Sequence, residues 1–218
     1  MATPGKERLK KRAGKVPVME RILIYIKHNL RFLWKLIELS NGLLFAVFFE
    51  KKLYRYLHEV FTEFALPPYD YRVLHDSEAK DLFNLIEQQD ISDLEHFKPH
   101  EFDLRSIMKQ FQNRALLMMG VFDQDKLIGY FFLRFFINRK CFVGRIIDRS
   151  YRGKGIGINM NRIMYEISWR MEFRCLSTIS LNNKNVLKAH ANNQAMNVIR
   201  KLPNDYLLVE FLREGSNK

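Results

Sequence analysis

The chain has 218 residues, and 47 % of them are hydrophobic, so it can bury a sizeable core and is not an intrinsically disordered protein. Its two cysteines, Cys141 and Cys175, form no C-x-x-C pair, which argues against a zinc finger or a disulfide framework and favours a reducing, cytoplasmic environment. The net charge of +12 divides into +7 over residues 1–72, −1 over 73–145 and +6 over 146–218. This distribution suits an anionic ligand, an anionic membrane face or a nucleic acid, and charge alone does not choose among them.

The first 66 residues are predicted to form a basic tail and a helical arm. Residues 1–18 combine six Lys and Arg with Pro and Gly, which is typical of a flexible tail. Residues 19–66 carry apolar side chains at helical spacing, with Asn41-Gly42 as an interruption. The uniformly apolar run at 43–49 is much shorter than the ~20 residues that span a bilayer, so a transmembrane helix is disfavoured. Two interpretations remain: peripheral contact with an anionic membrane, or helices packed on the domain or in a homodimer.

Residues 67–218 are predicted to form one mixed α/β domain. Changes between period 2 and period 3.6 in the apolar pattern mark its elements. Strands are expected at 71–74, 116–122, 126–137, 141–147, 176–181 and 205–212. Helices are expected at 77–88, at 102–112, from the glycines near 155 to about 172, and after Asn182-Asn183.

A glycine-rich loop joins the fourth of these strands to the long helix. Gly153, Gly155 and Gly157 lack Cβ atoms, so they tolerate positive φ and let main-chain N–H groups approach an anion. The following helix adds its free N–H groups and the positive end of its dipole. Arg149, Arg152 and Lys154 bring full charges to the same loop, which predicts a phosphate or pyrophosphate site.

The best-known phosphate-binding motifs do not fit this loop. A P-loop requires Ser or Thr after Gly-Lys, and the chain has Gly155 there; the dinucleotide-binding motif requires glycine at the position of Ile158. The loop instead matches R-x-x-G-x-G, at Arg152, Gly155 and Gly157. With the order of elements over roughly residues 69–213, this motif resembles the GNAT superfamily of acyl-CoA-dependent N-acyltransferases.

The resemblance implies an α/β fold of the α+β type, in which a mixed, mostly antiparallel twisted sheet is flanked by helices. It also implies acetyl-CoA as co-substrate, with no metal. The main chain of Ile146 and Ile147 would pair with the pantetheine arm, the N–H of Ile147 would face the developing oxyanion, and Asn183 would bond the same arm. The loop would hold the pyrophosphate through Arg149, Arg152, Gly153, Lys154, Gly155, Ile156 and Gly157.

His190 occupies the position at which the family has a catalytic Tyr. A histidine there could protonate the departing thiolate, because its reference pKa of about 6.5 permits proton exchange near neutral pH; a packed or exposed histidine is the alternative. Glu101, Asp148 or a water could be the general base. His96 and His100 are four residues apart, but Pro99 would break a metal-binding helix between them.

The resemblance implies an N-acetyltransferase that joins acetyl from acetyl-CoA to a primary amine, on a small molecule or amino sugar, by direct attack in a ternary complex. The sequence departs from the family pattern in two ways: the Gly-Phe that normally follows the Tyr is missing, and one final strand is predicted where the family commonly has two. The missing Tyr and Gly-Phe support a second hypothesis. The alternative is an inactive CoA-binding or scaffold module that recruits a partner or a membrane through residues 19–66. A nucleic-acid partner is disfavoured because only charge supports it.

Overall fold

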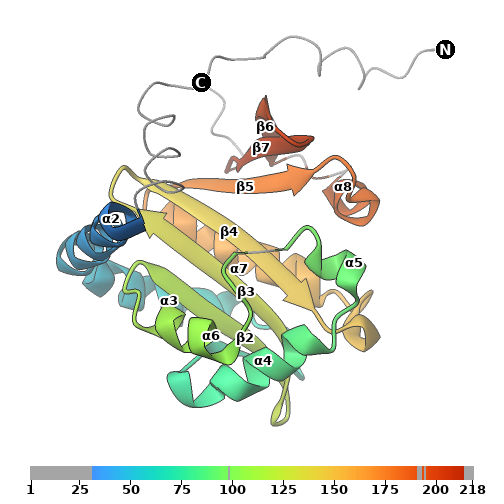
Figure 1. Cartoon of the computed structure of the whole chain (residues 1–218). Helices are drawn as coiled ribbons and strands as arrows, with labels where there is room; N and C mark the ends of the chain where they lie inside the picture. The colour runs from blue at the N-terminus through green and yellow to red at the C-terminus, as the bar shows by residue number, and fades with distance from the viewer. Residues whose placement is uncertain (1–30, 98, 191–192, 194, 214–218) are drawn as a thin grey trace.

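A computed structural model describes residues 31–213 except 98, 191, 192 and 194, so the predicted tail at 1–18 and the first part of the arm lie outside the described residues. Seven strands form one sheet in the order β1-β2-β3-β4-β5-β7-β6 (Figure 1). Every neighbouring pair is antiparallel except β4 and β5. The strands are β1 (Asp70–Val73), β2 (Leu116–Asp123), β3 (Lys126–Phe136), β4 (Lys140–Ile147), β5 (Arg174–Ser180), β6 (Met196–Leu202) and β7 (Tyr206–Phe211). The predicted α/β fold is confirmed.

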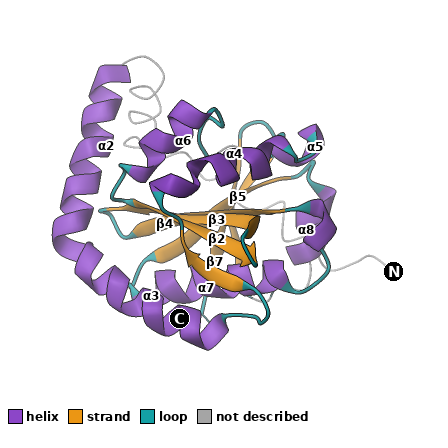
Figure 2. Ribbon diagram, turned by 90° about the horizontal axis from the view of Figure 1, so that it is seen from below, coloured by secondary structure: helices purple, strands orange, loops and turns teal. Residues whose placement is uncertain are grey.

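Helices cover both faces of the sheet (Figure 2). The helices are α2 (Arg31–Phe45), α3 (Lys51–Phe64), α4 (Ala79–Glu87), α5 (Ile91–Leu94), α6 (Leu104–Phe111), α7 (Ile156–Arg170) and α8 (Lys184–His190). Since β3 is apolar on both sides, alternate residues enter two cores: Phe131 and Leu133 pack towards α3 and α7, whereas Tyr130 and Phe132 pack towards α4 and α6.

The arm is more continuous than its sequence predicts. Residues 31–64 form α2, a π-helical turn at 46–50 and α3 without a break, so the predicted interruption at Asn41-Gly42 is wrong. The Asn41 side chain explains this, because it accepts from Ile137 N–H at 3.0 Å and donates to Phe135 O at 2.9 Å rather than competing with its own helix. By length and composition, the stretch Phe32–Phe64 is long and apolar enough to cross a membrane, which the run at 43–49 alone did not indicate.

The second half of the arm belongs to the packing of the domain. Leu53, Leu57 and Val60 of α3 are buried in the core that also contains α7. At the end of α3, the carbonyl of Phe64 accepts a hydrogen bond from the side chain of Asn159 in α7 at 2.8 Å. α3 is therefore anchored to the first turns of α7.

The chain ends in a hairpin rather than in a single strand. β6 and β7 pair antiparallel across a turn in which Asn204 and Asp205 have φ of 57° and 56°. Asn and Asp tolerate this left-handed conformation better than most residues. The prediction of one final strand is therefore wrong, and the structure removes that departure from the GNAT pattern.

Candidate active site

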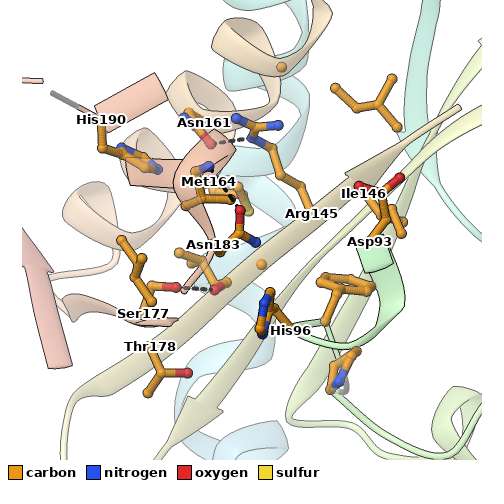
Figure 3. A pocket seen from close by; sticks show the side chains of 18 of the residues that line it. Asp93, His96, Arg145, Ile146, Asn161, Met164, Ser177, Thr178, Asn183 and His190 are labelled. Atoms are coloured by element: carbon orange, nitrogen blue, oxygen red, sulfur yellow. Dashed lines mark hydrogen bonds between the residues drawn. The ribbon is translucent and has the colours of Figure 1, made fainter. Parts of the chain in front are cut away.

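β4 and β5 separate from each other and open a cleft in the middle of the sheet. They pair in parallel only at three positions, from Lys140↔Arg174 to Phe142↔Leu176. Further along, the Ser177 hydroxyl donates to Val143 O at 3.1 Å, and beyond this contact both strands line a cavity of about 650 Å³ (Figure 3). This volume lies within the range of small-molecule sites.

The separated edge of β4 presents peptide groups to this cleft. Asp148 N–H donates to Ile128 O of β3 at 2.8 Å. Along an antiparallel pair, successive residues point their peptide groups alternately towards the partner strand and away from it. The peptide groups of Arg145 and Ile147 therefore point away from β3, towards the β5 side of β4. The Ile147 N–H therefore faces the cleft. Ile146, which is also predicted to pair with pantetheine, turns its peptide group towards β3 and lines the cleft by its side chain.

The glycine loop closes one end of the cleft. Gly153 and Gly155 have φ of 79° and 82°, so both adopt the left-handed conformation that glycine permits, and Gly155 is the N-terminal cap of α7. Within the described residues, the N–H groups from Gly153 to Gly157 donate no hydrogen bond. Gly153, Gly155 and Gly157 line the cleft, whereas Lys154 and Ile156 do not. The loop thus offers several N–H donors at the positive end of a helix.

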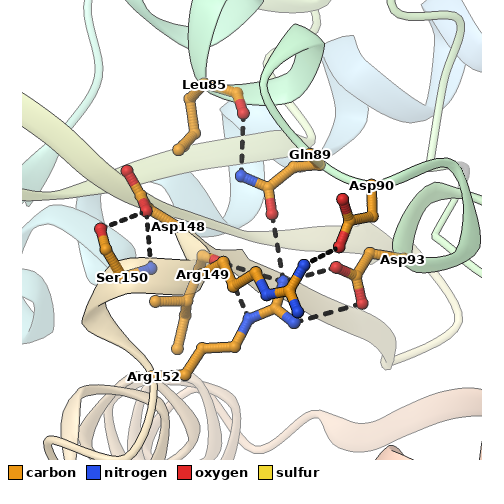
Figure 4. A network of polar contacts seen from close by, with 9 residues as sticks. Leu85, Gln89, Asp90, Asp93, Asp148, Arg149, Ser150 and Arg152 are labelled. Atoms are coloured by element: carbon orange, nitrogen blue, oxygen red, sulfur yellow. Dashed lines mark hydrogen bonds and ion pairs between the residues drawn. The ribbon is translucent and has the colours of Figure 1, made fainter.

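The cationic side chains of the loop are mostly engaged elsewhere (Figure 4). Arg149 pairs with Asp90 at 2.7 Å. Arg152 pairs with Asp93 at 2.7 Å and also donates to Gln89 Oε1 and Ile147 O. Both arginines therefore fasten the loop to the segment around α5, and their predicted phosphate contacts would require these pairs to open.

Lys154 differs from these two arginines. Its side chain is exposed, with Nζ 4.4 Å from the centroid of the Tyr151 ring, and within the described residues it has no ion pair. Among the three predicted loop cations, Lys154 is the one whose charge no carboxylate of the described chain neutralises. It lies on the outer side of the loop rather than on the cleft wall.

Arg145 is a cleft residue that the sequence analysis missed. Its Nε donates to Asn161 Oδ1 at 2.7 Å, and no carboxylate of the described residues lies within ion-pair distance. A Cβ on Gly157 would lie 2.8 Å from Arg145 Nη1, so the guanidinium lies beside the first turn of α7 and would have to shift if Gly157 carried a side chain. Burial lowers the pKa of Arg145. A cation at the positive end of a helix is unfavourable unless an anion joins it.

His190 lines the cleft from α8, but its surroundings do not suit the predicted proton exchange. The side chain is 8 % exposed, its ring lies 5.5 Å from that of Phe211, and its Nδ1 is 3.1 Å from the amide nitrogen of Asn193. Burial, with a smaller contribution from Arg145, lowers the pKa of His190 to about 4. The ring is therefore neutral at pH 7. Because the Asn193 amide donates to Nδ1, the remaining proton resides on Nε2.

The predicted general bases lie outside the cleft. Neither Glu101 nor Asp148 lines it. Burial alone would raise the pKa of Asp148, but hydrogen bonds from Ser150 and Lys126 leave it below its ordinary value. The carboxylates that do line the cleft are Asp93 and Glu95, beside His96. Sequence periodicity could not find these three, because they lie in and after the short helix α5.

The remaining predicted positions have simpler surroundings. Asn183 lines the cleft, and its Oδ1 accepts from Val186 N–H at 3.0 Å, as expected of a residue that caps α8. His96 and His100 do not form a pair, because His100 contacts Tyr130 and the main chain of Glu101. Within the described residues, no group of three metal-binding side chains converges.

A mostly antiparallel sheet that opens between its two parallel strands, with a glycine loop and a helix N-terminus at the opening, defines the GNAT fold. No family model and no curated protein matches this sequence. The structure is similar to the PaiA N-acetyltransferase of Thermoplasma acidophilum, solved with coenzyme A, at a TM-score of 0.56 and 15 % identity over 66 % of this chain and 99 % of that one.

Two further solved structures agree with this assignment of the fold. The ribosomal-protein-S5-alanine acetyltransferase of Vibrio fischeri has a TM-score of 0.56 and 16 % identity, over 71 % of this chain and 98 % of that one. The GNAT domain of the S. lividans protein PAT has a TM-score of 0.57 and 11 % identity, over 65 % and 88 %. The chain therefore has the GNAT fold.

Proposed function

We propose that the protein is an acyl-CoA-dependent N-acyltransferase that transfers acetyl from acetyl-CoA to a primary amine. One observation carries the proposal. N–H groups at the start of α7 that donate no hydrogen bond within the described residues lie at the same end of the cleft between β4 and β5 as the Arg145 guanidinium, which bonds to Asn161 but to no described carboxylate. Donors and positive charge at a helix N-terminus are what a diphosphate requires. The similar structures include acetyltransferases, one of them with bound coenzyme A, which supports the same choice.

The diphosphate would lie on the loop, and the pantetheine arm would run along the edge of β4. The thioester carbonyl would then reach the Ile147 N–H, which is placed to donate to a developing oxyanion. The neutral amine attacks the carbonyl carbon, and the C–N bond forms as the C–S bond breaks. The proton lost by the attacking nitrogen passes through solvent to the leaving sulfur, so that CoA departs as the free thiol. His190, neutral with its proton on Nε2, would donate a hydrogen bond to this sulfur rather than act as an imidazolium acid.

The acceptor side of the cleft favours a cationic amine. Asp93, Glu95 and His96 line the cleft. Asp93 already pairs with Arg152, so Glu95 is the carboxylate that would attract a protonated amine, which must then lose a proton before attack. Glu95 and His96 are the cleft residues that would accept that proton. A small molecule or an amino sugar remains the proposed acceptor class, and the buried, unpaired Cys141 and Cys175 are consistent with a cytoplasmic protein.

Isothermal calorimetry with acetyl-CoA, longer acyl-CoAs and free CoA tests the first half of the proposal. In the Gly155→Val variant a branched side chain occupies a residue with φ of 82°, which is strained, and it blocks the close approach of the diphosphate to the main chain. The affinity for acetyl-CoA should therefore fall at least about 100-fold. Gly42→Ala, in a helix with the nearest atom 3.7 Å from the new Cβ, is the matched control. Equal affinity of the Gly155→Val variant and the wild type, with both folded, would refute this site.

Thiol release on a panel of amines tests the second half. Steady release above the hydrolytic background supports the enzyme. Binding of acetyl-CoA without release on any amine would instead favour the alternative, an inactive CoA-binding module. The neutral state of His190 gives that alternative some structural support, because no imidazolium is present at pH 7 to protonate the leaving group.

A further inference from the structure

The outer side of α2 is an apolar surface that the described part of the protein leaves uncovered. Six of its side chains are exposed, and Val47 and Phe48 extend the surface into the π-helical turn with 77 % and 65 % of their area accessible. The six are Phe32, Leu33, Leu36, Leu39, Leu43 and Leu44. We call these eight residues the outer apolar face. A contiguous surface of this kind is unusual on a soluble monomer and marks an interaction site.

The width of this face indicates the kind of partner. At about 100° per residue, the exposed apolar positions of α2 from Leu39 round to Leu44 cover an arc of roughly 140°. The seam of a two-stranded coiled coil is narrower, because it uses two positions in seven. A wide apolar arc is what a helix presents when it lies in the surface of a bilayer with half of its circumference in the acyl region.

The C-terminal end of α2 is fixed to the domain, which argues against its crossing a membrane. Asn41 is bonded to the main chain at the end of β3, and Phe45 is fully buried with its ring 4.7 Å from that of Phe135. To cross a bilayer, the helix would have to release these contacts and expose Phe135 and its neighbours. The stretch Phe32–Phe64 has the length of a span, but the contacts of Asn41 and Phe45 hold the end of α2 against the domain.

Charges along α3 extend the same surface. Its acidic residues Glu59 and Glu63 pair with Arg170, and Glu50 of the preceding π-helical turn pairs with Arg114. Lys51 and Arg55 are exposed and form no ion pair within the described residues. Tyr54, which lies between them, is 58 % exposed. An apolar helix face followed by unpaired cations and an aromatic side chain is complementary to acyl chains beneath anionic headgroups.

We propose that the outer apolar face, with Lys51, Tyr54 and Arg55, docks the protein on the surface of a bilayer that contains anionic lipids. The apolar side chains enter the outer part of the acyl region, and the two cations contact the headgroups. The cleft between β4 and β5 is formed by other elements and does not take part in this contact.

Vesicle co-flotation of the full chain tests the proposal, with phosphatidylcholine vesicles that contain or lack phosphatidylglycerol. The apolar variant is Phe32→Ser, Leu43→Ser and Val47→Ser together, which should weaken binding at least about 30-fold, because each side chain loses part of its transfer free energy. Its control is Ile91→Ser, Leu104→Ser and Met108→Ser, which removes exposed apolar side chains from α5 and α6 and should leave binding unchanged.

A pair of charge-reversal substitutions measures the contribution of the headgroup contacts separately from that of the apolar side chains. Lys51→Glu with Arg55→Glu should weaken binding to anionic vesicles by about fivefold or more for each residue, and the loss should shrink in high salt. Arg105→Glu with Lys109→Glu on α6 makes the same change in net charge and should have little effect. Acetyl-CoA affinity should be the same in all variants, which shows that they are folded.

Three outcomes would overturn the proposal. The wild type could fail to float with either vesicle. It could float equally well after the apolar substitutions, in which case residues 1–30 or another surface bind the lipid. It could also sediment as a dimer that the apolar variant converts to monomer, and then the outer apolar face would be an interface between two copies of the chain.

Discussion

Replacing Arg145 by Met should weaken acetyl-CoA binding strongly without unfolding the domain. The guanidinium has Asn161 as its hydrogen-bond partner, has no carboxylate among the described residues, and lies beside the positive end of α7. In the unliganded protein this charge is partly buried and no described carboxylate compensates it. Removing the charge therefore recovers a desolvation free energy that offsets much of the free energy lost with the hydrogen bond. With a diphosphate bound, the same charge becomes favourable, because the anion compensates it.

The magnitudes of the two effects follow from these contacts. The hydrogen bond to Asn161 involves a charged donor and is worth about 1.5–3 kcal/mol, which the relieved desolvation of the guanidinium approximately cancels. The free energy of unfolding of the Met variant should therefore lie within about 1 kcal/mol of the wild type. Loss of one or two charge-assisted contacts to the diphosphate should raise the Kd of acetyl-CoA about 100-fold.

Urea unfolding and calorimetry measure these two quantities on the same sample. Arg162→Met is the matched control, because Arg162 is exposed on α7 and the substitution makes the same change in charge. S-acetyl-pantetheine, which lacks the diphosphate, should bind equally well to the Arg145 variant and the wild type. A stability loss above about 3 kcal/mol with unchanged affinity would show that Arg145 is structural and refute the reasoning.

Further predictions concern pH and the loop. Since the folded-state pKa of His190 is about 4, below the reference of about 6.5, the unfolded chain binds its proton first, and stability should fall by about 3 kcal/mol as pH drops from 6.5 to 4. His190→Gln should remove that part of the slope in urea unfolding measured against pH; an unchanged slope would contradict the burial argument. A double-mutant cycle of Arg152→Met and Asp93→Asn, measured by the free energy of unfolding, should give a coupling of about 1 kcal/mol for this partly exposed pair. Additive effects would show that this ion pair does not hold the glycine loop to α5.

Local patterns in the sequence were sufficient for most of the fold. The β2–β3 hairpin and the strand–glycine loop–helix unit depend on residues that follow one another, so apolar period and glycine placement identify them. β6 was missed because its one buried side chain is that of Arg200, with Lys201 next to it, so the strand lacks a clear apolar alternation. The helix break predicted at Asn41-Gly42 does not occur, because the Asn41 side chain hydrogen-bonds to main-chain groups about a hundred positions away in the sequence.

The ion pairs and protonation states of the site depend on contacts between residues far apart in the sequence, which apolar periodicity does not predict. Arg149 and Arg152 look like phosphate ligands in the loop, but their carboxylate partners lie 59 residues earlier, around α5. Arg145 becomes a cleft residue only because β4 and β5 separate beyond their third pair. His190 loses its proton because α8 folds against Phe211 and near Arg145. The sequence located the loop correctly, while the protonation states required the fold.

The arm itself should not be studied by deleting it. Removing residues 1–66 would strip Phe45, Leu53, Leu57 and Val60 from the core over α7, at about 2 kcal/mol for each buried side chain, or roughly 8 kcal/mol in all. That loss is comparable with the total stability of a typical domain, about 5–15 kcal/mol, so the truncated chain should aggregate or lose its cooperative unfolding transition. Loss of vesicle binding in such a chain would report unfolding and not docking. A truncated chain that unfolds cooperatively and binds acetyl-CoA with unchanged affinity would instead show that α3 is dispensable to the domain, contrary to its packing.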